Sequence, residues 1–380
     1  MTCIMYRHNI KAMRTLIILF ILLNAQFLLG SPSLIPFRQN NKWGYSNRNK
    51  QIIIKCIYDE ALPFSQGLGA VRSGTSWSFL NTKGKVIASG FENVYSFSDG
   101  RAAIKKGNKW GYINRLGKVV IPIIYSLAGN FIDNRAWVTD STNKAGFIKK
   151  SGQLITDIIY TSWGEFSQGR CWVQNGNTEN PNVIFIKRNG KPLTERKYFF
   201  ARDFNNNRAV VKCSAGSGYI NRRGKEVIKS RYDYCFSFSN GLALVIQNKD
   251  YYVINKKGKQ LFKLDYSFDE AIGHYSFNRL AVVKDGKAGY LNKKNHLITG
   301  LSFDTCNIFS DGLAAAKIQG KWGFVNKQGR LIIPTKYDTW FITGMTDLGD
   351  QGYYFKNGLC KVRYHGKEGY IDKNGNEYWQ

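Results

Sequence analysis

Residues 105–122 read KKGNKWGYINRLGKVVIP, and residues 320–334 read GKWGFVNKQGRLIIP. The two stretches are nearly the same phrase, written in distant parts of a chain of 380 residues. A catalytic motif used twice and a structural unit repeated many times would both explain the similarity. The spacing of the weaker copies of the phrase distinguishes between these explanations.

Two kinds of turn recur along the chain. One ends the phrase F-S-D-G, and the other ends the phrase N-x-x-G, as in INRLG. The final position of both phrases is almost always Gly or Asn, which adopt a positive φ at the lowest cost. The final residues of the first phrase, most of them about 34 residues apart, are Gly67, Gly100, Asn134, Gly169, Asn207, Gly241, Asn278, Gly312 and Gly358. The spacing favours a structural unit written about ten times.

Each unit reads as strand, turn, strand, turn, strand. The segments are short, carry Val, Ile, Tyr and Phe at alternating positions, and lack the 3.6-residue period of an amphipathic helix. We therefore expect an all-β fold of about ten stacked, three-stranded repeats in an open curved array with terminal caps. The alternative is a closed, propeller-like ring, although propeller blades usually have four strands and about 40–45 residues.

The first thirty residues have the pattern of a secretory signal peptide. Arg7, Lys11 and Arg14 precede the apolar run TLIILFILL, and Gly30–Ser31 is the expected cleavage site. A membrane anchor is the alternative, but the apolar stretch is shorter than the roughly 20 residues that a spanning helix needs. We therefore expect residues 31–380 to be the mature, extracytoplasmic repeat array: periplasmic, cell-surface or secreted.

The composition is strongly basic, with 55 Lys and Arg against 26 Asp and Glu and a formal net charge of +29. Such an excess favours anionic partners. Six cysteines follow the signal segment, which permits three disulfides in an exported protein. However, Cys171 and Cys360 hold the repeat position of Ala102 and Ala314, where a small buried residue is needed. We expect mostly free, buried thiols.

The phrases NKWGYINRLGKVVIP and GKWGFVNKQGRLIIP, each preceded by F-S-D-G, resemble the WG-repeat (KWG) family of bacterial proteins. The full phrase surrounds three Trp-Gly pairs: Trp43-Gly44, Trp110-Gly111 and Trp322-Gly323. In six other copies the tryptophan position holds another residue: Ala145, Val183, Ser217, Tyr251, Ala288 and Glu368. The resemblance implies a β-rich repeat array in exported or surface proteins, and it implies no shared catalytic activity.

The tryptophan and the glycine of each pair have separable roles. Tryptophan buries a large flat surface, and glycine allows a neighbouring backbone to approach closely. A sugar-stacking tryptophan is the alternative. Because most copies have lost the tryptophan, we favour packing over a repeated ligand pocket.

We expect no enzyme, no metal and no cofactor, because the sequence has no HExxH, CxxC, GxSxG or P-loop motif. The aspartates that follow the third strand, Asp59, Asp233, Asp304 and Asp338, are expected to cap turns. The irregular segment 339–355 interrupts the repeat, and long loops on repeats often bind ligands. A hydrolytic or enzyme-accessory protein with its site in that segment is therefore the alternative function.

Positive charge concentrates at the turn between the second and third strands of the repeats. The residues predicted to bind a polyanion are Arg115, Lys118, Lys149, Lys150, Lys187, Arg188, Arg222, Arg223, Lys225, Lys256, Lys257, Lys259, Lys293 and Lys294. They would form a stripe along one edge of the array. The stripe is either a solvated edge that prevents edge-to-edge pairing or a platform for an anionic partner. We expect a non-catalytic scaffold that binds acidic polysaccharide, lipopolysaccharide or another protein, with no specific small molecule and no integral membrane part.

Overall fold

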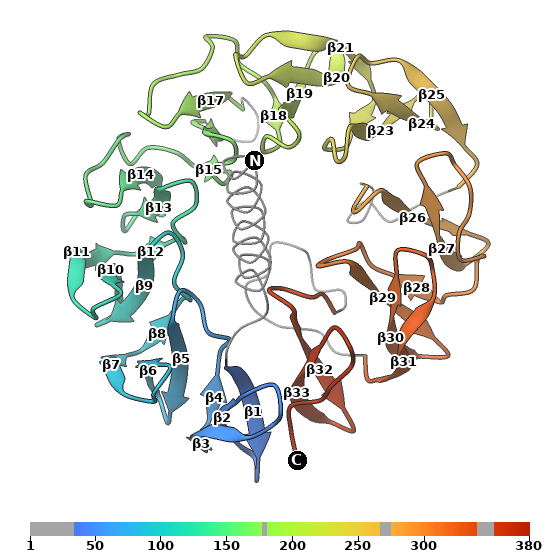
Figure 1. The fold of residues 1–380 in the computed structure, drawn as a ribbon. Coiled ribbons are helices and arrows are strands. Elements are labelled where there is room, and N and C mark those ends of the chain that lie inside the picture. The colour runs from blue at the N-terminus through green and yellow to red at the C-terminus, as the bar shows by residue number, and fades with distance from the viewer. Residues whose placement is uncertain (1–33, 177–180, 267–274, 340–352) are drawn as a thin grey trace, which may run out of the picture.

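The computed structural model describes residues 34–176, 181–266, 275–339 and 353–380. Within these residues the regular secondary structure is β-strand, in ten small antiparallel sheets that follow one another along the chain. Figure 1 shows the sheets arranged as the blades of a ring, and we number them 1 to 10 in chain order. The expected signal peptide, residues 1–30, lies outside the described residues.

A blade is a meander whose a, b, c and d strands run from the centre of the ring to its outer edge, as Figure 1 shows for blade 6. Every blade has a b strand and a c strand. The b strands are β1 (Ile35–Gln39), β5 (Leu68–Ser73), β9 (Arg101–Lys106), β13 (Arg135–Thr139), β16 (Arg170–Gln174), β19 (Arg208–Cys213), β23 (Leu242–Gln247), β26 (Arg279–Lys284), β29 (Leu313–Ile318) and β32 (Leu359–Tyr364). The c strands are β2 (Lys42–Ser46), β6 (Ser76–Asn81), β10 (Lys109–Asn114), β14 (Ala145–Lys149), β17 (Val183–Lys187), β20 (Gly216–Asn221), β24 (Asp250–Asn255), β27 (Lys287–Asn292), β30 (Lys321–Asn326) and β33 (Lys367–Asp372).

Most blades add a two-residue a strand at the centre, a d strand at the outer edge, or both. The a strands are β4 (Glu60–Ala61), β8 (Asn93–Val94), β12 (Leu127–Ala128), β15 (Ser162–Trp163), β18 (Phe200–Ala201), β22 (Tyr234–Cys235) and β28 (Thr305–Cys306). The d strands are β3 (Ile52–Tyr58), β7 (Val86–Phe91), β11 (Val119–Tyr125), β21 (Glu226–Tyr232), β25 (Gln260–Leu264) and β31 (Leu331–Tyr337). The prediction of three strands per repeat holds for three of the ten sheets, whereas five sheets have four strands and two have two. The a strand was not predicted, because a strand of two residues is too short to show an alternating pattern.

The sequence of the d strand fits its position at the exposed outer edge of the blade. In β11 Ile121 and Tyr125 are buried, while Val119 and Ile124 are exposed. Pro122 lies in this strand, where its missing N–H costs little because the strand is an edge. In blades 4 and 5 isolated bridges, Ala145 to Tyr160 and Val183 to Tyr198, replace the d strand.

The hydrophobic core lies between neighbouring blades. One cluster joins Ala70 and Phe79 of blade 2 to Ala102 and Ile104 of blade 3. Aromatic rings make edge-to-face contacts across the same junctions, as where the centroids of Phe79 and Phe97 lie 5.1 Å apart. Each blade therefore depends on its neighbours to bury its faces.

The first and last blades close the ring, and Figure 1 shows them side by side. The N–H of Arg38 in β1 donates to the carbonyl of Tyr378 (3.2 Å), and the N–H of Gln380 donates to the carbonyl of Arg38 (2.9 Å). A parallel bridge pairs Arg38 with Trp379 on the edge of β1 where other blades place an a strand. The rings of Trp43 and Tyr370 pack edge to face across the junction. We call this junction the seam.

Closure corrects the expectation of an open curved array, and the alternative of a closed, propeller-like ring is confirmed. The terminal copies bind each other and do not cap an open array. The short a strand explains how a four-stranded blade fits into about 34 residues, fewer than blades usually use. The predicted insertion 339–355 lies almost entirely outside the described residues, and only Thr339 and Tyr353–Phe355 belong to them.

Candidate functional site

The F-S-D-G phrases form the turns between a and b strands, which we call the inner-rim turns. In blade 3 the N–H of Ser98 donates to the carbonyl of Arg101 (2.8 Å) and the reverse bond is 3.0 Å long. Asp99 and Gly100 between them have φ of 48° and 81°. Two successive left-handed residues make a type I′ turn, which favours Asn-Gly and Asp-Gly. The expected left-handed turn is confirmed.

Hydrogen bonds connect consecutive inner-rim turns, and we call this series the turn ladder. The Ser65 hydroxyl of blade 2 donates to the carbonyl of Phe97 in blade 3 (2.7 Å), and the N–H of Gly100 donates to Oε1 of Gln66 (2.8 Å). The serine bond recurs from Ser98 to Phe131, Ser167 to Phe204, Ser276 to Phe309 and Ser310 to Phe355. The amide bond recurs from Asn134 to Asp99, Gly169 to Asp133, Asn207 to Gln168, Gly241 to Asn206 and Gly358 to Asp311.

The c–d turns lie on the same face of the ring, beside the inner-rim turns of the preceding blade. The guanidinium of Arg101, in blade 3, donates to the carbonyl of Lys150 in the c–d turn of blade 4 (3.3 Å from Nε). Gly190 of another c–d turn is so close to the preceding blade that a Cβ would lie 1.9 Å from the carbonyl oxygen of Ile155. The backbone of these turns is thus part of the blade junctions.

All fourteen residues predicted to bind a polyanion lie at c–d turns, so we call this side of the ring the turn-cation face. Most of their side chains are exposed, while Lys149, Lys150, Lys187 and Lys256 are half-buried. Among the described residues, Arg188 is the one member of the set in an ion pair, with Asp133. The structure thus brings the cations to one face, and their binding of a polyanion stays a prediction.

Like charges on this face affect one another. Burial, followed by repulsion from Arg222 and Arg188, lowers the pKa of Arg170 from its ordinary value. Burial and repulsion from Arg188 likewise lower the pKa of Arg135, against the attraction of Asp133. Positive charge is therefore concentrated here beyond what local carboxylates neutralise.

The b–c turns and the d–a connections lie on the opposite side, which we call the carboxylate face. Asp304 accepts a hydrogen bond from Nζ of Lys287 (2.9 Å) and another from the N–H of Gly320 (3.1 Å) in the b–c turn. Asp59 does the same with Lys42 and Gly74, and Asp338 with Lys321 and Gly366. The expected turn-binding role is confirmed for these three aspartates, although each binds a turn distant in sequence.

The lysines lower the pKa of these aspartates. For Asp338, the hydrogen bond from Lys321 is the largest cause, and the N–H of Gly366 adds to it. The pKa of Asp304 is lowered in the same way by Lys287 and then by Gly320. At these three positions of the carboxylate face, a cation and a carboxylate neutralise each other.

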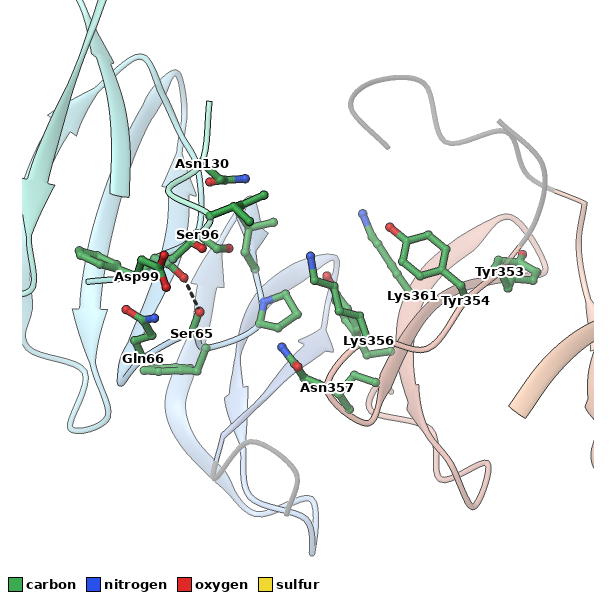
Figure 2. Close-up of a pocket in the computed structure, with 18 residues that line it drawn as sticks. Ser65, Gln66, Ser96, Asp99, Asn130, Tyr353, Tyr354, Lys356, Asn357 and Lys361 are labelled. Atoms are coloured by element: carbon green, nitrogen blue, oxygen red, sulfur yellow. Dashed lines mark hydrogen bonds between the residues drawn. The ribbon is translucent and has the colours of Figure 1, made fainter. Parts of the chain in front are cut away.

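A cavity of about 670 Å³ opens on the inner rim near the seam. Figure 2 shows Tyr354 and Lys356 of blade 10 on one side and Gln66 and Asp99 of blades 2 and 3 on the other. Sequence reasoning missed this site, because its walls come from opposite ends of the chain. One signal was present: Lys356 stands where the phrase normally has serine, in Phe355-Lys356-Asn357-Gly358.

A family model described as "WG containing repeat" matches eight segments that together cover more than half of the chain. The segments are 43–74, 77–110, 110–140, 146–178, 185–214, 218–251, 289–322 and 322–339. The chain belongs to the WG-repeat family. The predicted family is therefore confirmed. No curated protein matches the sequence.

Several solved structures resemble this WG-repeat ring. "Crystal structure of the eukaryotic initiation factor" shares 11% identity at a TM-score of 0.52, over 79% of this chain and 94% of that chain. BamB from Moraxella catarrhalis shares 8% identity at a TM-score of 0.39, over 81% of this chain and 94% of that chain. The C-terminal WD40 domain of Sif2 shares 12% identity at a TM-score of 0.39, over 80% of this chain and 92% of that chain. The first similarity concerns the fold alone.

The Trp-Gly pairs of the WG repeat are structural. Trp110 and Trp322 are only 3% and 5% exposed. A Cβ on Gly111 would lie 2.7 Å from the carbonyl oxygen of Ile121 in the neighbouring d strand, and one on Gly323 would lie 2.6 Å from that of Ile333. The packing role of the pair is thus supported, since buried rings cannot stack on a ligand.

The six cysteines among the described residues of this WG-repeat protein are free thiols. Cys171 and Cys360 are buried like Ala102 and Ala314, as expected from their shared repeat position. Burial raises the pKa of Cys235 to about 12. These thiols act as small apolar side chains.

Over the described ranges, we find no group of three or more His, Cys, Asp or Glu side chains that could hold a metal ion. In the same ranges no helix is long and apolar enough to cross a bilayer.

Proposed function

We propose that this WG-repeat protein is a non-catalytic scaffold outside the cytoplasm whose turn-cation face binds an anionic polymer. The extracytoplasmic location rests on the signal-like pattern of residues 1–30. The observation that carries the binding proposal is the contrast between the two faces. Several lysines of the carboxylate face are paired with aspartates, as in Lys42–Asp59, Lys287–Asp304 and Lys321–Asp338, whereas one of the fourteen predicted cations is in an ion pair within the described residues.

The spacing of the cations suits a polymer better than a small anion. Adjacent c–d turns belong to adjacent blades, so their charges are distributed around the ring and do not converge on one pocket. A ligand that carries a negative charge on each unit would contact several turns at once, and multivalent contact strengthens weak individual bonds. We take acidic polysaccharide as the polymer class.

The test uses a polyuronate as the probe and neutral dextran as its control. Affinity for polyuronate should fall steeply as ionic strength rises through about 0.1 M, where the Debye length is about 10 Å. Reversal of Arg222, Arg223, Lys256 and Lys257 to Glu should weaken binding at least about tenfold. The fold should persist, because Arg222 and Lys256 join the blade junctions through backbone carbonyls that accept from Arg170 and Arg208.

The matched control reverses four exposed lysines near the b–c turns of the carboxylate face: Lys106, Lys144, Lys249 and Lys367. Both variants have the same net charge, so a general charge effect would weaken binding equally in both. Equal weakening, or an affinity that ignores salt, would mean that the turn cations only solvate this side of the ring.

A further inference from the structure

The seam interrupts the turn ladder. Blades 2 to 6 each bind the next inner-rim turn, and blades 8 and 9 do the same. Blade 1 has no corresponding phrase, since the four residues before Leu34 read GSPS where F-S-D-G would stand. Between the inner-rim turns of blades 10 and 2, the sequence therefore has no F-S-D-G phrase to continue the ladder.

Four polar groups at the seam match groups that are bonded elsewhere in the ladder. On blade 2 they are the carbonyl of Phe64 and the N–H of Gly67, which correspond to those of Phe97 and Gly100 in blade 3. On blade 10 they are the side chains of Lys356 and Asn357, which correspond to Ser65 and Gln66. Within the described part of the chain none of these four groups has a ladder partner.

The cavity lies at this gap. Phe64, Lys356 and Asn357 line it, and its volume of about 670 Å³ falls in the range of about 300–1,000 Å³ that ligand sites occupy. In Figure 2 Lys356 and Asn357 come from one side and Ser65 and Gln66 from the other. The gap therefore offers both donors and acceptors at opposite walls, with apolar surface between them.

We infer that the cavity binds a turn of a partner protein with the sequence aromatic-Ser-Asp-Gly or aromatic-Ser-Asn-Gly. Such a turn would supply the missing rung of the ladder. Its serine hydroxyl would donate to the carbonyl of Phe64, and its Asp or Asn side chain would accept from the N–H of Gly67. On the other side, Lys356 would donate to the carbonyl of its aromatic residue, and its glycine N–H would donate to Oδ1 of Asn357.

Lys356 replaces the serine of most other inner-rim turns. This replacement suits an occupant that is not part of the ring. Within the ring a serine hydroxyl reaches the next carbonyl because successive blades hold it in place. A lysine ammonium is a longer and stronger donor, which suits a carbonyl that arrives on a separate chain. The inference does not depend on the polyanion proposal, because it uses none of the fourteen turn cations.

The experiment uses a disulfide-closed hairpin peptide with FSDG at its tip as the probe, and full-length protein. The control peptide has FADA at its tip, which removes the hydroxyl donor and disfavours the left-handed conformation of the last residue. We expect the FSDG peptide to bind and the FADA peptide to bind at least about tenfold more weakly. Amide exchange at Gly67 should slow when FSDG is bound.

Two variants test Lys356 on the blade 10 wall, and a third serves as their control. Lys356→Met should weaken FSDG binding about tenfold, because it removes a charge-assisted hydrogen bond while it keeps the length of the side chain. Lys356→Arg keeps a long, charged donor and should retain most of the affinity. Lys106→Met, on the carboxylate face, should change nothing.

Several results would overturn the inference. They are failure of FSDG to bind, equal binding of both peptides, or unchanged affinity of the Lys356→Met variant. Slow exchange at Gly67 in the free protein would also overturn it, because another part of this chain would then already hold that amide.

Discussion

The two faces of the ring differ in the side chains that accept hydrogen bonds from the backbone N–H groups of their turns. On the carboxylate face a charged side chain does it: Asp304 binds the N–H of Gly320 and also the ammonium of Lys287. At most c–d turns of the turn-cation face a neutral asparagine does it, as where the Asn114 side chain accepts from the N–H of Leu116 and of Lys118. The cations at the c–d turns are therefore not needed to hold those turns, and they can bind a partner without weakening them.

The faces also differ in how tightly their turns are packed, which gives the largest expected effect. Gly190→Ala, on the turn-cation face, places a Cβ 1.9 Å from the carbonyl oxygen of Ile155, while Gly107→Ala meets nothing within 4 Å. Both glycines have positive φ, 82° and 59°. Gly107→Ala should cost about 1–2 kcal/mol of unfolding free energy for the left-handed backbone, and Gly190→Ala about 3–5 kcal/mol.

Urea unfolding of the two variants beside the parent protein measures the difference. Equal losses would show that the c–d turns can move away from the preceding blade. The packing contrast between the faces would then be wrong.

Acid should act on the carboxylate face. The pKa of Asp338 is held below its ordinary value by Lys321 and the N–H of Gly366. A lowered pKa in the folded state means that the carboxylate stabilises the fold above the ordinary Asp value of about 4. That contribution is lost as the pH falls from about 4 through the lowered value.

Asp338→Asn should therefore lower the urea midpoint at neutral pH and flatten its decline below about pH 4. Asp157→Asn, at an exposed aspartate of blade 4, serves as the control and should leave the profile close to that of the parent. If both variants follow the parent profile, the aspartate–lysine–glycine contacts contribute nothing to stability.

The smallest expected effect is none. The six described cysteines are free, so no disulfide fastens either face, and a reducing agent should leave the Tm unchanged. Burial raises the pKa of Cys306 to about 12, so this thiol should resist alkylation in the folded protein. Mass spectrometry should find label first at the half-buried Cys56 and Cys213. A drop in Tm on reduction would indicate a covalent link.

Turn chemistry made much of the fold predictable. Gly and Asn at repeated positions marked the left-handed turns. Lys50, which stands where the N-x-x-G phrase normally ends in Gly or Asn, also has a positive φ, of 61°. The two-residue a strands carried no pattern, so the fourth strand was missed. Closure was only the alternative prediction, because the bridge from Arg38 to Trp379 depends on the accumulated rotation of all the blades, which no local sequence expresses.

The candidate sites divide in the same way. The basic turns recur with the repeat, so their common face could be inferred from register alone. The cavity depends on Gln66 and Lys356 meeting across the seam, and that meeting exists only once the ring has closed.

The seam also sets the order of events when the protein is made. Each ordinary blade junction joins residues a few dozen positions apart, so it can form as soon as the next repeat leaves the ribosome. The seam joins residues such as Gln39 and Gln380, which are 341 positions apart. Blade 1 must therefore wait with its inner edge uncovered during nearly all of synthesis, when a chaperone or another nascent chain can reach it.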